Sequence, residues 1–340
     1  MKKAVKKGGK AVLFVLLFCV LFSCVSAALN STGDYRHQNW IRSFYAEKKN
    51  SLDAVYVGSS AAYAFWCSPV AWHDYGIAVH PFTTSGQRIL MTKYVIEEGR
   101  KTQPDALYIL NMNTIGTTYS TAHLHYLADE MPMSLNKLRL IREVCDYSDF
   151  DQKEFILPIY RYHSRWSTLT YKDFNLSFNT YKGAPSYTGF LKNKTNVSGN
   201  YEQTDEKTRP SETYMKQLDS LLSYIEENGV RVLFVFSPQG IDAKRQSYFH
   251  YITAYLREKG YDVLNMFECM EETGIDLKTD FYNTRHTNLN GALKTTDYLA
   301  KYLVEHYGFS DKRGEKAYES WDRAYEDYRL LINKYAKSSG

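Results

Sequence analysis

The sequence predicts an α/β fold in which helices wind around both faces of a five-stranded parallel sheet. Two observations favour this fold: short β-branched or aromatic apolar runs recur along the chain, and longer segments with helical periodicity separate them. The expected strands are residues 53–57, 77–82, 106–111, 230–236 and 261–266. The expected helices are residues 86–101, 211–228, 244–259 and 288–306. Pro210 and Gly229 bound the second of these helices, as start and stop signals should.

Residues 114–209 form a long insertion between the third and fourth strands and are rich in Tyr, Asn, Lys and Ser. Loops of this length inside compact domains usually carry function. We expect a helix at residues 134–144, and we expect His163, Arg165 and Trp166 to contact a polymer or phosphate substrate. The alternative is structural, since arginine packed on tryptophan is a common structural pair.

The N-terminus carries an export signal. Lysines crowd the first ten residues, an apolar run covers residues 11–25, and the small residues Ser26-Ala27-Ala28 follow. The apolar part is slightly shorter than the roughly 20 residues that span a bilayer, so a cleaved signal peptide and an uncut membrane anchor both stay open. The predicted organisation is a signal or anchor at 1–28, an α/β domain at 29–312 and a C-terminal helix at 313–340. Apolar and aromatic residues recur at helical spacing over 315–337, and this helix should dock on the body.

The charge and cysteine content exclude several classes. Without the five N-terminal lysines, the 42 basic residues become 37 against 38 acidic ones, which argues against a nucleic-acid partner. Cys67, Cys145 and Cys269 are too few and too widely spaced for a disulfide framework or a CxxC site. His123-x-His125 has no third ligand nearby, so we expect no metal and no cofactor. The 30 tyrosines are general packing residues or, alternatively, line a sugar-binding groove.

Small polar residues follow the first three expected strands. The carboxyl ends of parallel strands share one edge of the sheet, where ligands bind, so these residues should form one site. They are Gly58-Ser59-Ser60, Thr84-Ser85-Gly86 and Asn111-Met112-Asn113-Thr114. Ser60 is the candidate nucleophile. Its own N–H, the N–H of Gly86 and the side-chain amide of Asn113 are candidate donors to the oxyanion of a tetrahedral intermediate.

His286, in Asn283-Thr284-Arg285-His286, is the candidate general base for Ser60. Each assignment has an alternative. Ser60 could cap a helix, instead of or in addition to acting as the nucleophile, and Ser59 is the nucleophile if the block is shifted by one residue. His286 could be a surface residue near a helix start, and Asn113 could be a turn residue that ends a strand.

These blocks resemble those of the SGNH hydrolases, also called GDSL-type esterases and lipases. The matching residues are Gly58-Ser59-Ser60, Gly86, Asn111-Met112-Asn113-Thr114, and Asn283-x-x-His286 with its continuation to Asn288-x-x-Gly291. The resemblance covers residues 53–306 without the insertion, and it implies a flavodoxin-like SGNH fold. Together with the N-terminal segment, it is nearest to membrane-anchored cell-envelope members such as the proteins that help D-alanylate teichoic acids. It implies an exported esterase or O-acyltransferase that acts on acyl esters of glycans, with a membrane acyltransferase as a candidate partner.

The chain departs from the family pattern at the histidine's partner, where Asn283 replaces the usual aspartate. In a serine protease that replacement costs about 10⁴ in turnover. Asp280 could take over the role if the turn folds back toward His286. The alternative function is therefore a weakly active or inactive binding or scaffold protein of the cell envelope.

Overall fold

The structure is a computed structural model that describes residues 2–29, 41–116, 119–170, 173, 183–185, 187, 189–191 and 204–339. For residues 2–7, 27, 158 and 335–339 it describes the backbone only. Part of the predicted insertion, residues 114–209, therefore lies outside the described residues.

Five parallel strands form the central sheet in the order β2-β1-β3-β4-β5. They are β1 (Ala54–Gly58), β2 (Val79–Thr83), β3 (Leu107–Asn111), β4 (Val232–Phe236) and β5 (Val263–Asn265). All five predicted strands are confirmed, with boundaries that differ by a few residues. The order 2-1-3-4-5 is that of flavodoxin-like folds. Pro81 lies in β2, where it is tolerated because β2 is an edge strand.

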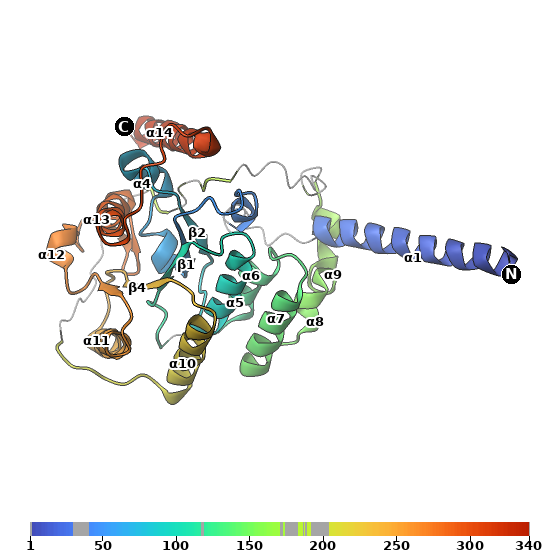
Figure 1. Cartoon of the computed structure of the whole chain (residues 1–340), viewed down its shortest axis with the longest axis horizontal. Helices are drawn as coiled ribbons and strands as arrows, with labels where there is room; N and C mark the ends of the chain where they lie inside the picture. The colour runs from blue at the N-terminus through green and yellow to red at the C-terminus, as the bar shows by residue number, and fades with distance from the viewer. Residues whose placement is uncertain are drawn as a thin grey trace.

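Alternate side chains of each strand enter two separate cores, one on each face of the sheet. Val55 and Val57 pack in one core beneath α5 (Ile89–Arg100), α10 (Glu212–Glu227) and α11 (Ala243–Glu258). Ala54 and Tyr56 pack in the other, beneath α4 (Ser68–Tyr75) and α13 (Leu289–Tyr307). Figure 1 shows α5 and α10 on one side of the strands and α4 and α13 on the other. The predicted winding of helices around both faces is thus confirmed.

Several helices lie in the described part of the segment between β3 and β4. They are α6 (Thr121–Ala128), α7 (Leu135–Ser148), α8 (Lys153–Ile156), α9 (Pro158–Tyr162) and the 3-10 helix η1 (His163–Thr168). The helix expected at residues 134–144 corresponds to α7, which packs against α5. This segment therefore enlarges one face of the sheet.

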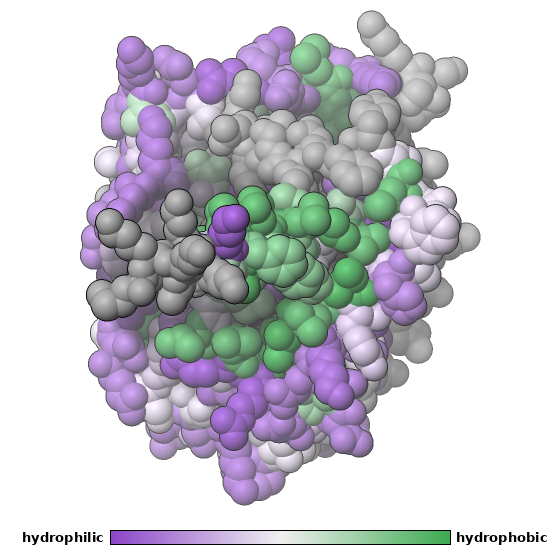
Figure 2. Space-filling view, turned by 90° about the vertical axis from the view of Figure 1, so that its right-hand side faces the viewer, coloured by the Kyte–Doolittle hydropathy of each residue, from purple (hydrophilic) through white to green (hydrophobic). Residues whose placement is uncertain are grey.

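The N-terminal helix α1 (Lys2–Leu29) projects away from the body (Figure 1). Its segment Gly8–Ser26 is long and apolar enough to cross a membrane, a test that a signal sequence near the N-terminus also passes. Figure 2 looks onto this side of the molecule, with α1 pointing toward the viewer, and shows an apolar patch in the middle of the view, where the exposed apolar side chains of α1 lie. Only the end of the helix packs on the protein, through the buried Ala28 and Leu29.

The C-terminal helix α14 (Glu319–Ser339), preceded by η4 (Lys316–Tyr318), packs against α4. Trp321 is buried there, and Trp72 stacks on Tyr318 with ring centroids 5.3 Å apart. The indole N–H of Trp72 donates to Asp322 Oδ1 at 2.9 Å. The tail thus adds aromatic packing to the core that contains Val55 and Val57.

Three short elements complete the fold near the carboxyl ends of the strands. They are α3 (Ser60–Tyr63), α12 (Met270–Thr273) and the hairpin of β6 (Phe281–Asn283) and β7 (His286–Thr287). The hairpin was not predicted, because strands this short leave no period in the sequence.

Candidate active site

The chain turns sharply from β1 into α3 at Gly58-Ser59-Ser60. A Cβ atom on Gly58 would lie 2.6 Å from Cβ of Asn111, so only glycine fits this close approach of β1 to β3. Ser59 is the N-cap of α3, and its Oγ accepts a hydrogen bond from the N–H of Ala61 at 3.3 Å. The capping role considered for Ser60 therefore belongs to Ser59, which leaves the hydroxyl of Ser60 for another partner.

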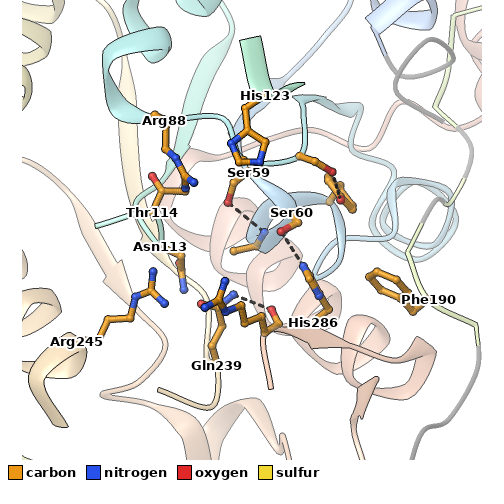
Figure 3. Close-up of a pocket in the computed structure, with 15 residues that line it drawn as sticks. Ser59, Ser60, Arg88, Asn113, Thr114, His123, Phe190, Gln239, Arg245 and His286 are labelled. Carbon is orange, nitrogen blue, oxygen red and sulfur yellow. Dashed lines mark hydrogen bonds between the residues drawn. The ribbon is translucent and has the colours of Figure 1, made fainter. Parts of the chain in front are cut away.

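That partner is His286. The Oγ atom of Ser60 lies 2.7 Å from Nε2 of His286, across the gap between α3 and β7 (Figure 3). The two residues are 226 positions apart in the chain. The structure thus brings together the serine and the histidine that the sequence pointed to, in the geometry of a nucleophile and a general base.

Asn283 fixes the tautomer of His286. Its Oδ1 atom accepts hydrogen bonds from the backbone N–H groups of Arg285 at 2.9 Å and His286 at 3.1 Å, so the amide must point its oxygen into the turn. The same oxygen lies 3.0 Å from Nδ1 of His286. Nδ1 must therefore carry the proton, and Nε2 is left as an acceptor for the hydroxyl of Ser60.

His286 is held neutral by its surroundings. Burial lowers its pKa to about 4, and the positive charge of Arg285 acts in the same direction. Phe190 contributes to this cover: its ring stacks on Tyr282 at 4.4 Å and lies 5.0 Å from the imidazole, measured between centroids. Phe190 belongs to residues 114–209, so the long segment after β3 returns to the candidate site.

The loop after β4 holds the hairpin turn in place. The N–H of Gly240 donates to the carbonyl of Thr284 at 2.7 Å, and the side-chain amide of Gln239 donates to the carbonyl of Arg285 at 2.7 Å. The position of His286 therefore depends on the end of β4 as well as on its own hairpin.

Asp280 does not take the orienting role that the sequence left open for it. Its Oδ2 atom lies 2.7 Å from Nζ of Lys294 and accepts the N–H of Asp276 at 2.8 Å. The carboxylate is buried in this turn, and Asn283 occupies Nδ1 of His286. Of the two orienting residues that the sequence left open, the β6-β7 hairpin directs Asn283 rather than Asp280 toward the imidazole.

The continuation of the last block is structural. Asn288 is the N-cap of α13, and a Cβ on Gly291 would lie 2.2 Å from the carbonyl oxygen of Asp280. Both residues seat α13 closely on the turn that carries His286.

The side chain of Asn113 is fixed by Ser237, which follows β4. Its Oδ1 accepts the N–H of Ser237 at 2.9 Å, and its Nδ2 donates to the carbonyl of Ser237 at 2.7 Å. The second hydrogen of Nδ2 is not used by these contacts, and Asn113 lines the cavity beside Ser60. This is the arrangement expected of a preorganised oxyanion donor.

Gly86 also borders this cavity. It has φ +66°, and a Cβ there would lie 2.4 Å from the ring of His123, so the position requires glycine. Within the described residues, the backbone N–H groups of Gly86 and Ser60 have no acceptor. The three predicted oxyanion donors, Ser60, Gly86 and Asn113, therefore all border one cavity.

The cavity has a volume of about 350 Å³. Figure 3 shows Phe190 beside His286 on one side of Ser60, and Asn113 on the other. Sequence reasoning missed several lining residues: Arg88, His123, Phe190, Gln239, Arg245 and Arg285. The rule that polar residues after each strand share one site was applied to the first three strands only. Applied to the fourth strand as well, it would have pointed to Gln239. Arg285 was visible beside His286, but its charge was not considered.

A second cavity, of about 230 Å³, lies next to the first and shares Arg88 and Thr114 with it. Tyr119, Tyr147 and Tyr214 line this second cavity. Three of the chain's tyrosines thus lie beside the serine site.

His163, Arg165 and Trp166 are not among the lining residues of either cavity. They lie in η1, beside the end of α1. A guanidinium N–H of Arg165 donates to the carbonyl of Leu29 at the C-terminal end of α1, and Arg165 Nη2 lies 2.9 Å from Asp173 Oδ1. Trp166 is 74% exposed. Because their helix lies at the base of α1, these residues do not belong to the site around Ser60, and the expectation that they contact a polymer or phosphate stays a prediction.

The two histidines of His123-x-His125 have separate surroundings. Nδ1 of His125 is 3.1 Å from Oδ1 of Asp129, and its ring stacks on Phe155, whereas His123 lines the cavity. The side chains of the described ranges form no group of three or more ligands that could hold a metal ion.

Comparison with known proteins gives no family assignment: no protein-family model matches the chain, and no curated protein matches it.

Proposed function

We propose that this protein is an exported serine esterase or O-acyltransferase of the SGNH type, acting on acyl esters of cell-envelope or extracellular glycans. The observation that carries the proposal is the chain of contacts from Ser60 Oγ to His286 Nε2 and from His286 Nδ1 to Asn283 Oδ1. The position of this chain at the carboxyl ends of the strands of a 2-1-3-4-5 sheet supports the proposal, as does the amide of Asn113 in the same cavity.

In this mechanism Ser60 Oγ attacks the ester carbonyl carbon while its proton passes to Nε2 of His286. The carbonyl π electrons move to oxygen, where Asn113 Nδ2 and the N–H groups of Ser60 and Gly86 donate to the oxyanion. The intermediate collapses as the C–O bond to the alcohol breaks, and the imidazolium returns its proton to the departing alkoxide. The acyl-serine is then cleaved by water in hydrolysis or by a hydroxyl group in transfer, with His286 again taking and returning one proton.

Asn283 should lower turnover by less than the corresponding replacement of aspartate by asparagine does in a serine protease. The loss of about 10⁴ in that case comes from an imidazole in the wrong tautomer. Here the two backbone N–H groups orient the amide oxygen toward Nδ1, so the tautomer is the useful one. The remaining deficit is the missing negative charge beside the imidazolium.

A fluorophosphonate probe tests the mechanism, because it reacts with an activated serine. We expect covalent labelling of purified residues 29–340, absent in Ser60→Ala and retained in Ser59→Ala. Mass spectrometry of the labelled peptide identifies the serine. Labelling that survives Ser60→Ala, or no labelling of the wild type, would refute the mechanism.

The second candidate is a binding or scaffold protein of the cell envelope, which the uncharged Asn283 favours. Wild type and Asn283→Asp would then both lack activity and retain glycan binding. A membrane acyltransferase is a candidate partner in either case, and co-purification with the full chain tests for one.

The N-terminal helix supports an extracytoplasmic location, either secreted or membrane-anchored. If α1 is retained, we expect the full chain to stay in the membrane pellet after alkaline carbonate extraction. A protein of residues 29–340, which lacks α1, should appear in the soluble fraction.

A further inference from the structure

Three arginines border the cavity that contains Ser60, and each comes from a different segment. Arg88 is the N-cap residue of α5, Arg245 lies in the first turn of α11, and Arg285 lies in the hairpin turn. Figure 3 shows Arg88 and Arg245 on the side of the cavity opposite Phe190. Among the described residues that line this cavity, none is aspartate or glutamate.

The three charges act on one another. The pKa of Arg88 is lowered to about 10, chiefly by burial; Tyr119 opposes this shift, and the positive charges of Arg245 and Arg285 contribute to it. Burial and Arg285 also lower the pKa of Arg245, while Asp242 opposes them. Like charges around a concave site focus a positive potential in it, and an anion that enters the site relieves their repulsion.

Two of these arginines, Arg245 and Arg285, are held by hydrogen bonds. A guanidinium N–H of Arg245 donates to the carbonyl of Ile115 at 3.3 Å, and four of its five N–H groups are not used by this contact. The backbone of Arg285 is fixed at both its N–H, by Asn283, and its carbonyl, by Gln239. Arg285 therefore lies in the turn that positions His286, and Arg245 is tied to the loop after β3 that carries Asn113.

We infer that the ester substrate carries an oxyanion group, a phosphate or a carboxylate, which Arg88, Arg245 and Arg285 bind beside the ester that Ser60 attacks. This inference rests on the proposed function and adds the class of substrate to it. The planar guanidinium group pairs with phosphate and carboxylate through two parallel hydrogen bonds, which suits it to this task better than lysine.

Matched ester pairs test the inference. Phenyl acetate is compared with 4-acetoxybenzoate and with 4-acetoxyphenyl phosphate, which place the anion on the alcohol part. 4-Nitrophenyl pentanoate is compared with mono-4-nitrophenyl succinate, which places it on the acyl part. The measured quantity is the ratio of kcat/KM for each anionic ester to that for its neutral counterpart, and the better of the phosphate and carboxylate probes identifies the group.

We expect at least one anionic ester to be preferred by about tenfold or more, since a charge-assisted hydrogen bond contributes roughly a decade or more in affinity. Arg88→Gln, Arg245→Gln and Arg285→Gln should each lower that ratio about tenfold. Lys244→Gln is the matched control, because Lys244 is exposed and precedes Arg245 on α11, and the ratio should not change. No preference for any anionic ester, or a ratio that the arginine variants leave unchanged, would overturn the inference.

A binding measurement separates this inference from the proposed function. Inorganic phosphate and acetate are titrated calorimetrically into full-length Ser60→Ala, which needs no turnover. Loss of anion binding when Arg245→Gln is combined with Ser60→Ala, and retention of binding when Lys244→Gln is combined with it, would support the oxyanion site. This holds even if the wild-type protein hydrolyses none of the esters. Absence of binding of both anions, or equal binding in both double variants, argues against the site even if neutral esters are hydrolysed.

Discussion

Oδ1 of Asn283 lies 3.0 Å from Nδ1 of His286 and also accepts two backbone N–H groups of the same turn. One amide oxygen thus orients the imidazole without adding a charge. An aspartate would accept the same three donors and would also stabilise the imidazolium formed during catalysis.

We therefore expect Asn283→Asp to raise kcat at neutral pH by at least tenfold, about 1.4 kcal/mol in activation free energy. Burst and steady-state kinetics with 4-nitrophenyl acetate measure the change. Asn290→Asp adds the same charge at an exposed position at the start of α13 and should leave kcat as it is. A lower kcat in Asn283→Asp would show that the neutral amide is required.

The pH dependence of kcat/KM should reflect the neutral state of His286. A general base works only when unprotonated, and burial with Arg285 lowers the pKa of His286 to about 4. Activity should therefore persist as the pH falls below 6.5 and decline near pH 4. In Arg285→Gln the neighbouring charge is gone, so the decline should move to higher pH. The same acidic midpoint in both proteins would contradict the role given to Arg285, and Lys244→Gln serves as the charge control.

Asn113→Ala should lower kcat by about 10² to 10³, the effect of removing one oxyanion donor. The change also removes the contacts to Ser237, so the melting temperature must be measured alongside. Ser237→Ala is a suitable comparison, because it removes the hydroxyl that donates to the carbonyl of Ala61 at 2.8 Å but no donor that lines the cavity. If the two variants lose kcat equally, Asn113 acts through structure alone.

The fully buried His80 should make the fold sensitive to acid. Its Nδ1 is 3.1 Å from the carbonyl of Pro81 and its Nε2 is 3.2 Å from the hydroxyl of Ser43; burial lowers its pKa from 6.5 to about 3. Between these values the unfolded chain binds a proton that the folded protein excludes, so the free energy of unfolding falls as the pH falls through this range.

From pH 7 to pH 5 this single group should cost about 2 kcal/mol, measured as a shift in urea unfolding. His80→Gln should remove that part of the pH dependence. Ser43→Ala should lower the free energy of unfolding at both pH values, but the difference between the two pH values should remain. An unchanged pH dependence in His80→Gln would contradict the assignment.

Much of the architecture was predictable because it is local. The apolar runs that became β1 to β5 and the periodic segments that became α5, α10, α11 and α13 carry their own signals of strand and helix. The polar residues at the strand ends were predictable for a similar reason, since parallel strands present their carboxyl ends at one edge. Ser60, Gly86 and Asn113 were found by that rule.

The sequence by itself therefore determined the sheet, its principal helices and the pairing of Ser60 with His286 as a hypothesis. Only the tertiary structure decided that Asn283 rather than Asp280 orients the imidazole, that Arg165 caps α1, and that Arg88, Arg245 and Arg285 border one cavity. The physical reason is that these contacts join side chains from segments far apart in the chain. Their directions depend on a two-strand hairpin and on loop packing, which no periodic pattern records.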